Sequence, residues 1–475
     1  MNTRMESDSI GTLEVPADAY YGVQSLRAKQ NFPITGHPMH KLLIVSLAQI
    51  KKAAAMANRH AGTLDEEKAQ AIVTACDEII GGKLHDQFIV DAIQGGAGTS
   101  ANMNANEVIA NRAIELLGGV KGDYSIVHPN DHVNMAQSTN DVYPTAGKLA
   151  ALALLPQVST QLNRLYEALE SKAVEFDDIV KMGRTQLQDA VPIRLGQSFR
   201  AYASAISRDA RRLHQAAADL CVVNMGATAI GTAINVSPDY LSRIVPELRE
   251  VTKYPLLQAT DLIDGTQNLD CFVHVSGIIK TCAVTLSKMS NDLRLLSSGP
   301  RTGLSEINLP AKQNGSSIMP GKVNPVIPEV MSQVAFNIIG NDTCITMAAE
   351  AGQLELNAFE PVLFYKLFES LETLAGGIQT LVDNCILGIT ANREHCLELV
   401  EHSVGMVTAL CPYIGYKRAA ELAKESLKTG VPIRKLVVQQ GIVSADQVDE
   451  ILNPLKLTFT EKERAELDAA AKALD

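Results

Sequence analysis

The sequence predicts an all-α, mainly helical fold organised around a central bundle of long helices. Composition is the first observation, because aromatic residues are only 4% of the 475 residues and tryptophan is absent, whereas strands favour aromatic and β-branched side chains. Periodicity is the second, because apolar residues recur at steps of three and four over long runs. The clearest run has the spacing of an a/d seam and consists of Phe272, Val275, Ile279, Cys282, Leu286, Met289, Leu293 and Leu296.

The first part of the chain, residues 1–140, is interrupted often by glycine, proline and asparagine, which predicts short elements. The expected helices are 42–60, 65–80 and 101–117. Little strand is expected, and the best short candidates are 11–15 and 32–35. We therefore interpret residues 1–140 as an N-terminal helical domain.

The central part, residues 141–396, contains three long apolar runs at helical spacing, over 149–176, 199–220 and 272–296. A helix of about 25 residues is about 38 Å long, and helices of that length bury one another well in a bundle. Pro156 is expected to kink the first helix or to start a new one. Apolar seams on more than one face would also bind other chains, so we expect an oligomer.

The last part, residues 397–475, is predicted to contain shorter helices than the central bundle. Gly415, Gly430 and Pro432 are among the breakers that divide it into short helical segments. We interpret this part as a third, small helical domain.

The charge and the termini of the chain exclude several classes of partner. There are 42 Lys and Arg against 53 Asp and Glu, a formal net charge of −11, which argues against general binding to nucleic acid or anionic membranes. No run of about 18 apolar residues predicts a membrane span, and residues 1–11 lack the apolar segment of a secretory signal. None of the eight cysteines forms a C-x-x-C pair, so we expect reduced thiols in a cytoplasmic protein.

Two polar clusters precede expected helices. GGAGTSANMN at 95–104 places Thr99 at a helix N-terminus, where backbone N–H groups attract carboxylates or phosphates. QSTND at 137–141 precedes the first long helix, and its candidate side chains are Ser138, Thr139 and Asn140. Either cluster alone is more typical of a helix cap than of a binding site.

A further polar segment, MGRTQLQDAVP at 182–192, follows the first long helix and carries Thr185 and Gln186 directly after Arg184. Taken alone, it fits a polar turn between helices as well as it fits a binding site. Because the whole chain is negative, a site for an anionic substrate would have to be locally positive, and Arg184 is a candidate source of that charge.

The third polar cluster is the irregular loop GSSIMPGKVNP at 315–325, whose glycines and proline favour mobility. Its candidate side chains are Ser316, Ser317, Lys322 and Asn324. Two hydroxyls, one cation and one amide on a flexible loop fit closure over a small anion. A plain surface turn is the alternative, but Ile318 and Met319 argue against it, since apolar residues in a solvated loop need something to cover.

Two other glycine-rich segments lack the features that a phosphate or dinucleotide site requires. GATAIGT at 226–232 has glycine spacing like a phosphate-binding loop but lacks its lysine. The glycines at 95–98 follow no clear strand, so they predict no dinucleotide site. Among the ten histidines, only His128 of HPND at 128–131 is kept as a binding candidate.

GSSIMPGKVNP resembles the signature of the fumarase/aspartase superfamily, and the other clusters occur in the order expected for that family. The similarity extends over essentially the whole chain, from ADAYYGVQ at 17–24 onward. Four local choices resemble aspartases more than fumarases: AYYG at 19–22, GGAGTS, QSTND, and NPVIPEV after the loop.

The resemblance implies three helical domains whose central bundles pack as a homotetramer with a twenty-helix core, each active site being shared by three subunits. It implies reversible deamination of L-aspartate to fumarate and ammonia, by removal of a Cβ proton through an aci-carboxylate intermediate. This chemistry requires no metal or organic cofactor, and activation by a divalent cation such as Mg²⁺ stays open. The implied partners are therefore small dicarboxylates and further copies of the chain.

The resemblance also implies roles for individual residues. Ser316 matches the general base, which Lys322 would help to activate. Lys322 and Asn324 match the groups that hold the α-carboxylate, and Asn140 matches a ligand of the amino group. The matches to the β-carboxylate binders are Thr99, Ser138, Thr139 and Thr185. Ser317 matches a residue that lines the site.

Two positions need separate comment. Gln186 stands where many relatives have histidine, so a mechanism that needs an imidazole there does not apply. The segment 128–131 matches a secondary anion site of fumarases.

Two other functions stay open from the sequence. One is fumarate hydratase, or a lyase for another amino-dicarboxylate. The other is a catalytically silent helical scaffold, as some relatives serve in the lens, and the joint presence of Ser316, Lys322 and Asn324 argues against it.

Overall fold

The computed structural model describes residues 2–472. The chain falls into two compact units that are each assembled from three segments. Unit 1 consists of Met1–Thr160, Arg211–Ala283 and Ala335–Ala375, and unit 2 of Gln161–Ala210, Val284–Val334 and Gly376–Asp475. This grouping cuts across the long helices, so the division into three domains at 140 and 396 stays a prediction.

The described chain is mainly helical, as predicted. Its α-helices are α1 Val23–Asn31, α2 Lys41–His60, α3 Glu66–Ile80, α4 Thr99–Leu116, α5 Thr139–Glu175, α6 Leu195–Ala216, α7 Pro238–Thr252, α8 Asp264–Gln267, α9 Asp270–Leu296, α10 Val326–Glu350, α11 Glu360–Asn384, α12 Arg393–His402, α13 Cys411–Thr429, α14 Ile433–Gln439, α15 Ala445–Ile451 and α16 Glu461–Lys472. None of the helices within residues 2–472 is long and apolar enough to cross a membrane.

The strands are short and form two-stranded pairs. They are β1 Thr3–Ser7, β2 Thr12–Pro16, β3 Val180–Thr185, β4 Gln188–Arg194, β5 Val222–Val223, β6 Leu257–Gln258, β7 Ile307–Asn308 and β8 Thr390–Ala391. The expected strand at 11–15 is confirmed by β2. The expected strand at 32–35 is wrong, because Thr35 N and Gly36 N donate to the Asp91 carboxylate at 2.8 and 2.9 Å instead of to a neighbouring strand.

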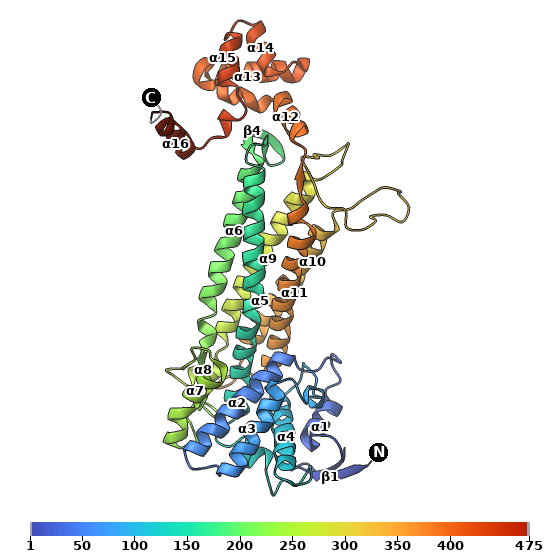
Figure 1. Cartoon of the computed structure of the whole chain (residues 1–475), viewed down its shortest axis with the longest axis vertical. Coiled ribbons are helices and arrows are strands. Elements are labelled where there is room, and N and C mark those ends of the chain that lie inside the picture. Colours follow the sequence, from blue (N-terminus) through green and yellow to red (C-terminus); the bar gives the residue numbers. More distant parts are fainter. Residues whose placement is uncertain (1, 473–475) are drawn as a thin grey trace. The chain divides into compact units, whose positions relative to one another are not determined.

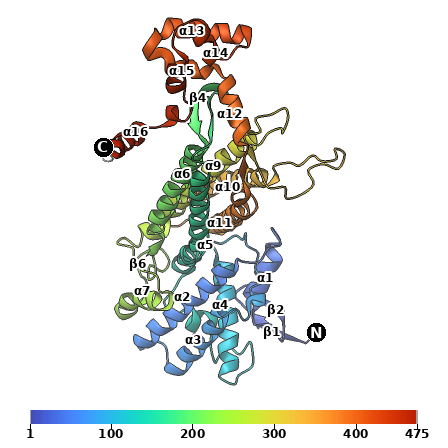
Figure 2. The same ribbon diagram turned by 45° about the horizontal axis from the view of Figure 1, so that its top comes forward.

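Within each unit, segments of the long helices α5, α9, α10 and α11 run side by side, and α6 joins them in unit 2 (Figures 1 and 2). The a/d seam predicted on α9 is buried from Phe272 to Leu293. In unit 1, the Phe364 ring of α11 packs against Tyr143 of α5 and Phe272 of α9, with centroids 5.2 and 5.1 Å apart. Gly147 lets α5 approach this ring, since a Cβ there would lie 2.1 Å from Phe364. These contacts hold α5, α9 and α11 against one another within unit 1.

Helix α5 continues from Thr139 to Glu175 through Pro144 and Pro156. The alternative that Pro156 starts a new helix is therefore wrong. An interior proline costs a helix about 3 kcal/mol, but the neighbouring apolar side chains Leu155 and Val158 are buried. Their packing outweighs the local penalty.

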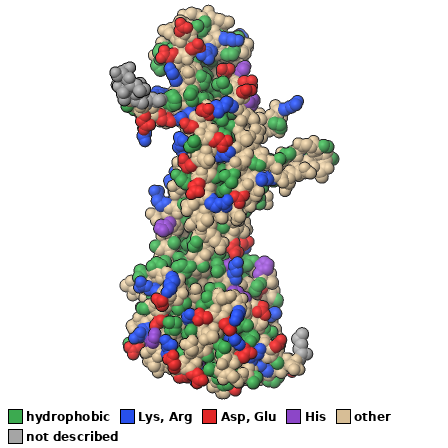
Figure 3. Space-filling model, in the orientation of Figure 1, with side chains coloured by type: hydrophobic (Ala, Val, Ile, Leu, Met, Phe, Trp, Pro, Cys, Tyr) green, Lys and Arg blue, Asp and Glu red, His purple; other side chains and the backbone are tan. Residues whose placement is uncertain are grey.

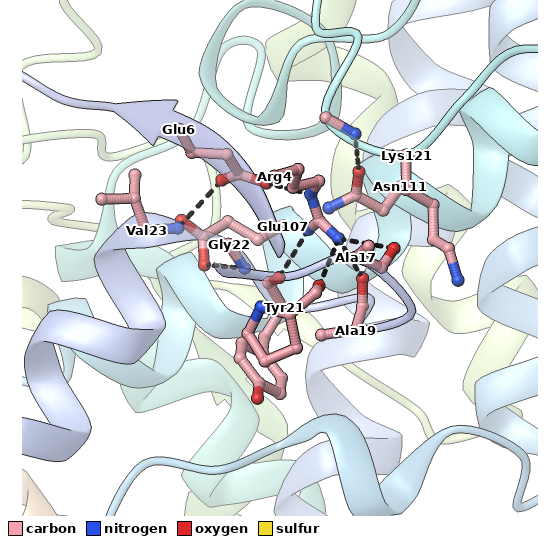
Figure 4. Close-up of polar contacts among 12 residues, drawn as sticks. Arg4, Glu6, Ala17, Ala19, Tyr21, Gly22, Val23, Glu107, Asn111 and Lys121 are labelled. Atoms are coloured by element: carbon pink, nitrogen blue, oxygen red, sulfur yellow. Dashed lines mark hydrogen bonds and ion pairs between the residues drawn. The ribbon is translucent and has the colours of Figure 1, made fainter. Parts of the chain in front are cut away.

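In unit 1, a buried polar network holds the N-terminal AYYG segment against α4 (Figure 4). Glu107 of α4 accepts from the backbone N–H groups of Gly22, Gln24 and Ser25 at 2.8, 2.8 and 3.1 Å, which caps the start of α1. Burial raises the pKa of the Glu107 carboxyl, whereas these hydrogen bonds act to lower it. Gly22 has no room for a side chain, since a Cβ would lie 2.5 Å from the carboxylate of Glu6.

Candidate active site

The first group of candidate residues lies at the N-termini of α4 and α5, within unit 1. Gly96 and Gly98 have φ angles of 88° and 86°, so they turn the chain into α4 in a conformation that favours glycine. A Cβ at Gly98 would also lie 2.3 Å from the Tyr143 ring of α5. This close approach brings the two helix starts together. Thr99 begins α4 with its side chain exposed.

A buried amide joins these two helix starts. Asn102, one turn after Thr99, donates from Nδ2 to Thr139 Oγ1 at 3.1 Å and to Asn134 Oδ1 at 3.1 Å. Lys51 of α2 donates to the same Asn134 oxygen at 2.7 Å. Burial lowers the pKa of Lys51 to about 7, although the nearby Asp141 opposes this shift. The network fixes the position of the Thr139 hydroxyl, and the sequence analysis did not find Lys51 or Asn102.

Asp141, in the first turn of α5, organises the backbone of the second cluster. It is fully buried and accepts from Ser138 N at 2.9 Å through Oδ1. Through Oδ2 it accepts from Gly226 N and Thr228 N at 3.1 and 3.0 Å. Burial raises the pKa of Asp141 to about 6, and these hydrogen bonds oppose the rise. QSTND contains this residue, but its role required the fold, because its partners Gly226 and Thr228 are more than 80 positions away.

The second group of candidate residues lies in unit 2. Two of its members, Thr185 and Gln186, lie on a β-hairpin that the sequence analysis did not predict. Strands β3 and β4 pair antiparallel, with Thr185 opposite Gln188. Gln186 and Leu187 form the turn with φ angles of 54° and 63°, the left-handed values of a type I′ turn. No Asn-Gly or Asp-Gly pair marks this turn. Thr185 and Gln186 are both exposed at the tip.

A buried ion-pair cluster anchors the hairpin. Glu306 is fully buried and lies 2.8 Å from Arg184 Nη1 and 3.2 Å from Lys181 Nζ. The charge of Arg184, suggested above as a source of positive field, is thus committed to Glu306. The two cations and one carboxylate leave the cluster with a formal charge of +1.

The hairpin also lines a cavity of unit 2 of about 1010 Å³, to which Arg184 and Thr185 both contribute. This places an open, water-accessible volume directly beside the candidate residue Thr185.

The third polar cluster is a loop that projects from unit 2 between β7 and α10, with hydrophobic atoms at its end (Figures 1 and 3). Ser316 Oγ accepts from the backbone N–H groups of Ile318 and Met319 at 3.2 and 2.9 Å. Two such donors favour the ionised form of the hydroxyl. Ile318 is 83% exposed, and that the loop closes over a ligand stays a prediction.

The neck of the loop is closed by its own backbone. Gly315 N donates to Lys322 O at 3.0 Å, and Asn324 Nδ2 donates to Gly315 O at 2.6 Å. Asn324 is half-buried, whereas Ser317 and Lys322 are exposed. The Lys322 ammonium has no partner among the described residues, so it is available to an anion.

Gly315 allows a sharp test of this loop. A Cβ at this position would lie 2.5 Å from Asn324 N and 2.6 Å from Lys322 O, both backbone atoms that cannot rotate away. We expect Gly315→Ala to open the neck and to lower turnover by at least about tenfold, because about 1.4 kcal/mol of lost positioning gives that factor. Steady-state kinetics checks this, with Gly376→Ala as the milder comparison, since Gly376 lies inside helix α11 in the same unit and a Cβ there meets no atom within 4 Å. Equal effects of the two changes would contradict the role assigned to the neck.

The candidate residues thus fall into two groups. Thr99, Ser138, Thr139 and Asn140 lie together in unit 1 at the two helix starts. The unit 2 candidates are Thr185, Gln186, Ser316, Ser317, Lys322 and Asn324. Within residues 2–472, no hydrogen bond or ion pair joins the hairpin tip to the loop.

His128, the remaining candidate, has a local structural role in unit 1. Its Nδ1 accepts from Asn130 N and Asp131 N, both at 3.2 Å. The ring nitrogen therefore caps the short turn of π-helix at Pro129–Val133. That 128–131 binds an anion stays a prediction.

The described part of the chain contains no group of three or more His, Cys, Asp or Glu side chains placed to hold a metal ion. Its eight cysteines are free thiols, four of them buried and four partly exposed.

Comparisons with known proteins place the chain in a family. Residues 11–340 match the lyase family, and residues 406–459 match the C-terminal domain of fumarase C. The chain therefore belongs to the fumarase/aspartase superfamily of lyases. Aspartate ammonia-lyase of a Bacillus species is 54% identical over 460 residues, covering 96% of this chain and 98% of that protein. Aspartate ammonia-lyase of Escherichia coli K12 is 50% identical and covers 95% of both chains.

Solved structures agree with the helical fold. A fumarate lyase:delta crystallin from Brucella melitensis, bound to cobalt, is 51% identical with a TM-score of 0.94 and covers 97% of this chain and all of that one. A class II fumarase from Schistosoma mansoni is 36% identical with a TM-score of 0.93, covering 96% of this chain and 99% of that one.

Proposed function

We propose that this protein is an aspartate ammonia-lyase, which converts L-aspartate reversibly to fumarate and ammonia. Relatives of that name are 50–54% identical over nearly their full length. The structural observation that carries the chemistry is Ser316, whose hydroxyl accepts from two backbone N–H groups on an exposed loop. A neutral serine is a poor base, and these two N–H donors stabilise its alkoxide form.

The difficult step is removal of a proton from Cβ, a very weak carbon acid. In the proposed mechanism Ser316 takes this proton while the adjacent carboxylate takes up a second negative charge. The hydroxyls proposed to stabilise that charge are Thr99, Ser138, Thr139 and Thr185. Donors aimed at developing charge are each worth about 10²–10³ in rate. The C–N bond then breaks at Cα and ammonia leaves with the bonding electron pair.

The remaining candidates hold the rest of the substrate. Lys322 and Asn324 bind the α-carboxylate, and Asn140 accepts from the amino group. Ser317 lines the closed site, and Gln186 acts through its amide in place of an imidazole. This chemistry requires no metal or organic cofactor, and stimulation by Mg²⁺ is compatible with it.

We propose a homotetramer in which each site draws on several subunits. The support is the face of α10 in unit 1, where Phe336 and Met347 are 63% and 67% exposed and Ile339 lies between them. Large apolar side chains in a row on one helix face mark an interface. Light scattering at four times the chain mass would agree, and a fully active monomer would contradict shared sites.

A cytoplasmic location belongs to the same proposal. Eight free cysteines, half of them partly exposed, suit a reducing compartment.

The test of function is a substrate panel that follows fumarate by its ultraviolet absorbance. L-Aspartate is expected to release fumarate, and fumarate with ammonium is expected to be consumed. Release from malate but not from L-aspartate would identify a hydratase instead, and no release from any dicarboxylate would favour a silent scaffold.

A further inference from the structure

The GATAIGT segment at 226–232, rejected as a phosphate loop, lies against the start of α5 in unit 1. Gly226 N and Thr228 N both donate to Asp141 Oδ2. Asn224 Nδ2 donates to the carbonyl of Asn140 at 3.0 Å. The Asn140 side chain in turn donates from Nδ2 to Ala229 O at 2.7 Å. Residues 224–229, called the brace below, thus contact both the backbone and the side chain of Asn140.

The brace determines which end of the Asn140 amide is exposed. A carbonyl oxygen at 2.7 Å must face the amide nitrogen, because two oxygens at that distance would repel each other and form no hydrogen bond. The amide oxygen is therefore the end turned away from the brace. No donor among the described residues reaches it.

We propose that the brace is a specificity element, which holds the Asn140 amide with its oxygen toward the substrate and so selects a protonated amine at that position. This inference rests on the proposed function. An ammonium group offers only donors, so it pairs with the amide oxygen and is repelled by the amide nitrogen. With the amide reversed, the site would instead suit an acceptor such as a hydroxyl oxygen.

The backbone conformation of the brace is unfavourable by itself, so the surrounding contacts must maintain it. Thr228 is a β-branched residue at a φ of 58°, where such residues are strained. Its side chain is buried, and Thr228 Oγ1 has no hydrogen-bond partner among residues 2–472. The hydrogen bonds from Gly226 and Thr228 to Asp141 maintain this conformation against the local preference.

The experiment compares two changes at Thr228. Thr228→Pro cannot adopt the positive φ and has no N–H for Asp141, so it displaces Ala229 O. Thr228→Gly keeps both features and is the matched control. For each variant we measure KM for L-aspartate and the inhibition constant of succinate, a dicarboxylate without an amino group. Asn224→Ala, which removes the donor to Asn140 O, is the second variant in case Thr228→Pro does not fold.

We expect Thr228→Pro, or Asn224→Ala in its place, to raise KM for L-aspartate at least tenfold while the succinate constant stays within twofold. Thr228→Gly should resemble the parent. Parallel weakening of both ligands, or no change in either, would overturn the brace as a specificity element. A parent protein that binds succinate but releases no fumarate from L-aspartate would instead refute the proposed function.

Discussion

Replacing Ser316 by alanine is expected to lower kcat by about 10³-fold or more, within the range of about 10²–10⁴ for loss of a general base. The reason is local, because alanine retains the backbone of the loop but has no oxygen to accept the Cβ proton. Ser316 Oγ also accepts from Ile318 N and Met319 N at 3.2 and 2.9 Å. Its removal frees two exposed N–H groups that water can satisfy, so the fold should persist.

The measurement is kcat for fumarate release, together with the affinity for succinate by calorimetry. Thr302→Ala, which removes an exposed hydroxyl earlier in the same unit, is the control and should leave both unchanged. Ser316→Ala should retain succinate binding within about threefold, since the change falls on the chemical step and not on carboxylate binding. Fumarate release at the parental rate would show that another group takes the proton.

Helix positions were largely predictable because burial of one helix face imposes a period that a sequence displays directly. The expected helix at 65–80 corresponds to α3, with Asp65 as its cap, accepting from Lys68 N at 2.9 Å. The expected helix at 42–60 corresponds to α2. The alternative that Pro156 starts a new helix was wrong because the local penalty of the proline is smaller than the stabilisation from packing of the long helix around it.

The hairpin at 180–194 could not be predicted from local signals. Its turn is formed by Gln186 and Leu187 in place of the usual Asn-Gly pair, and Pro192 lies inside β4. The hairpin is instead held by Glu306, more than 100 positions away in sequence. Long-range pairing of this kind leaves no periodic trace.

The site residues were named from their polar clusters, the family resemblance supplied their roles, and the structure adds the groups that position them. Thr139 and Asn140 were named from their cluster, but the residues that fix them, Asn102 and Ala229, were not. A buried asparagine has no pattern that separates it from any polar residue on a helix. Such supporting contacts become visible only when the fold brings distant segments together.

Glu306→Ala is expected to destabilise the protein by about 3–5 kcal/mol, the usual cost of leaving buried charge without its partner. Glu306 is fully buried, and its two oxygens lie 2.8 Å from Arg184 and 3.2 Å from Lys181. Alanine would leave two cations close together in a poorly solvated place. Because both cations belong to β3, the hairpin should also shift, and turnover should fall along with stability.

The matched control is an exposed ion pair of the same unit. Asp178 and Arg393 are 2.7 Å apart with side chains 67% and 55% exposed, so Asp178→Ala should cost at most about 1 kcal/mol. Urea unfolding of the two variants at equal protein concentration measures the difference. Glu306→Gln separates charge from shape, since it keeps an acceptor for Arg184 but removes the negative charge. If Glu306→Ala were no more destabilising than Asp178→Ala, the buried cluster would not be what holds the hairpin, and Thr185 would need another anchor.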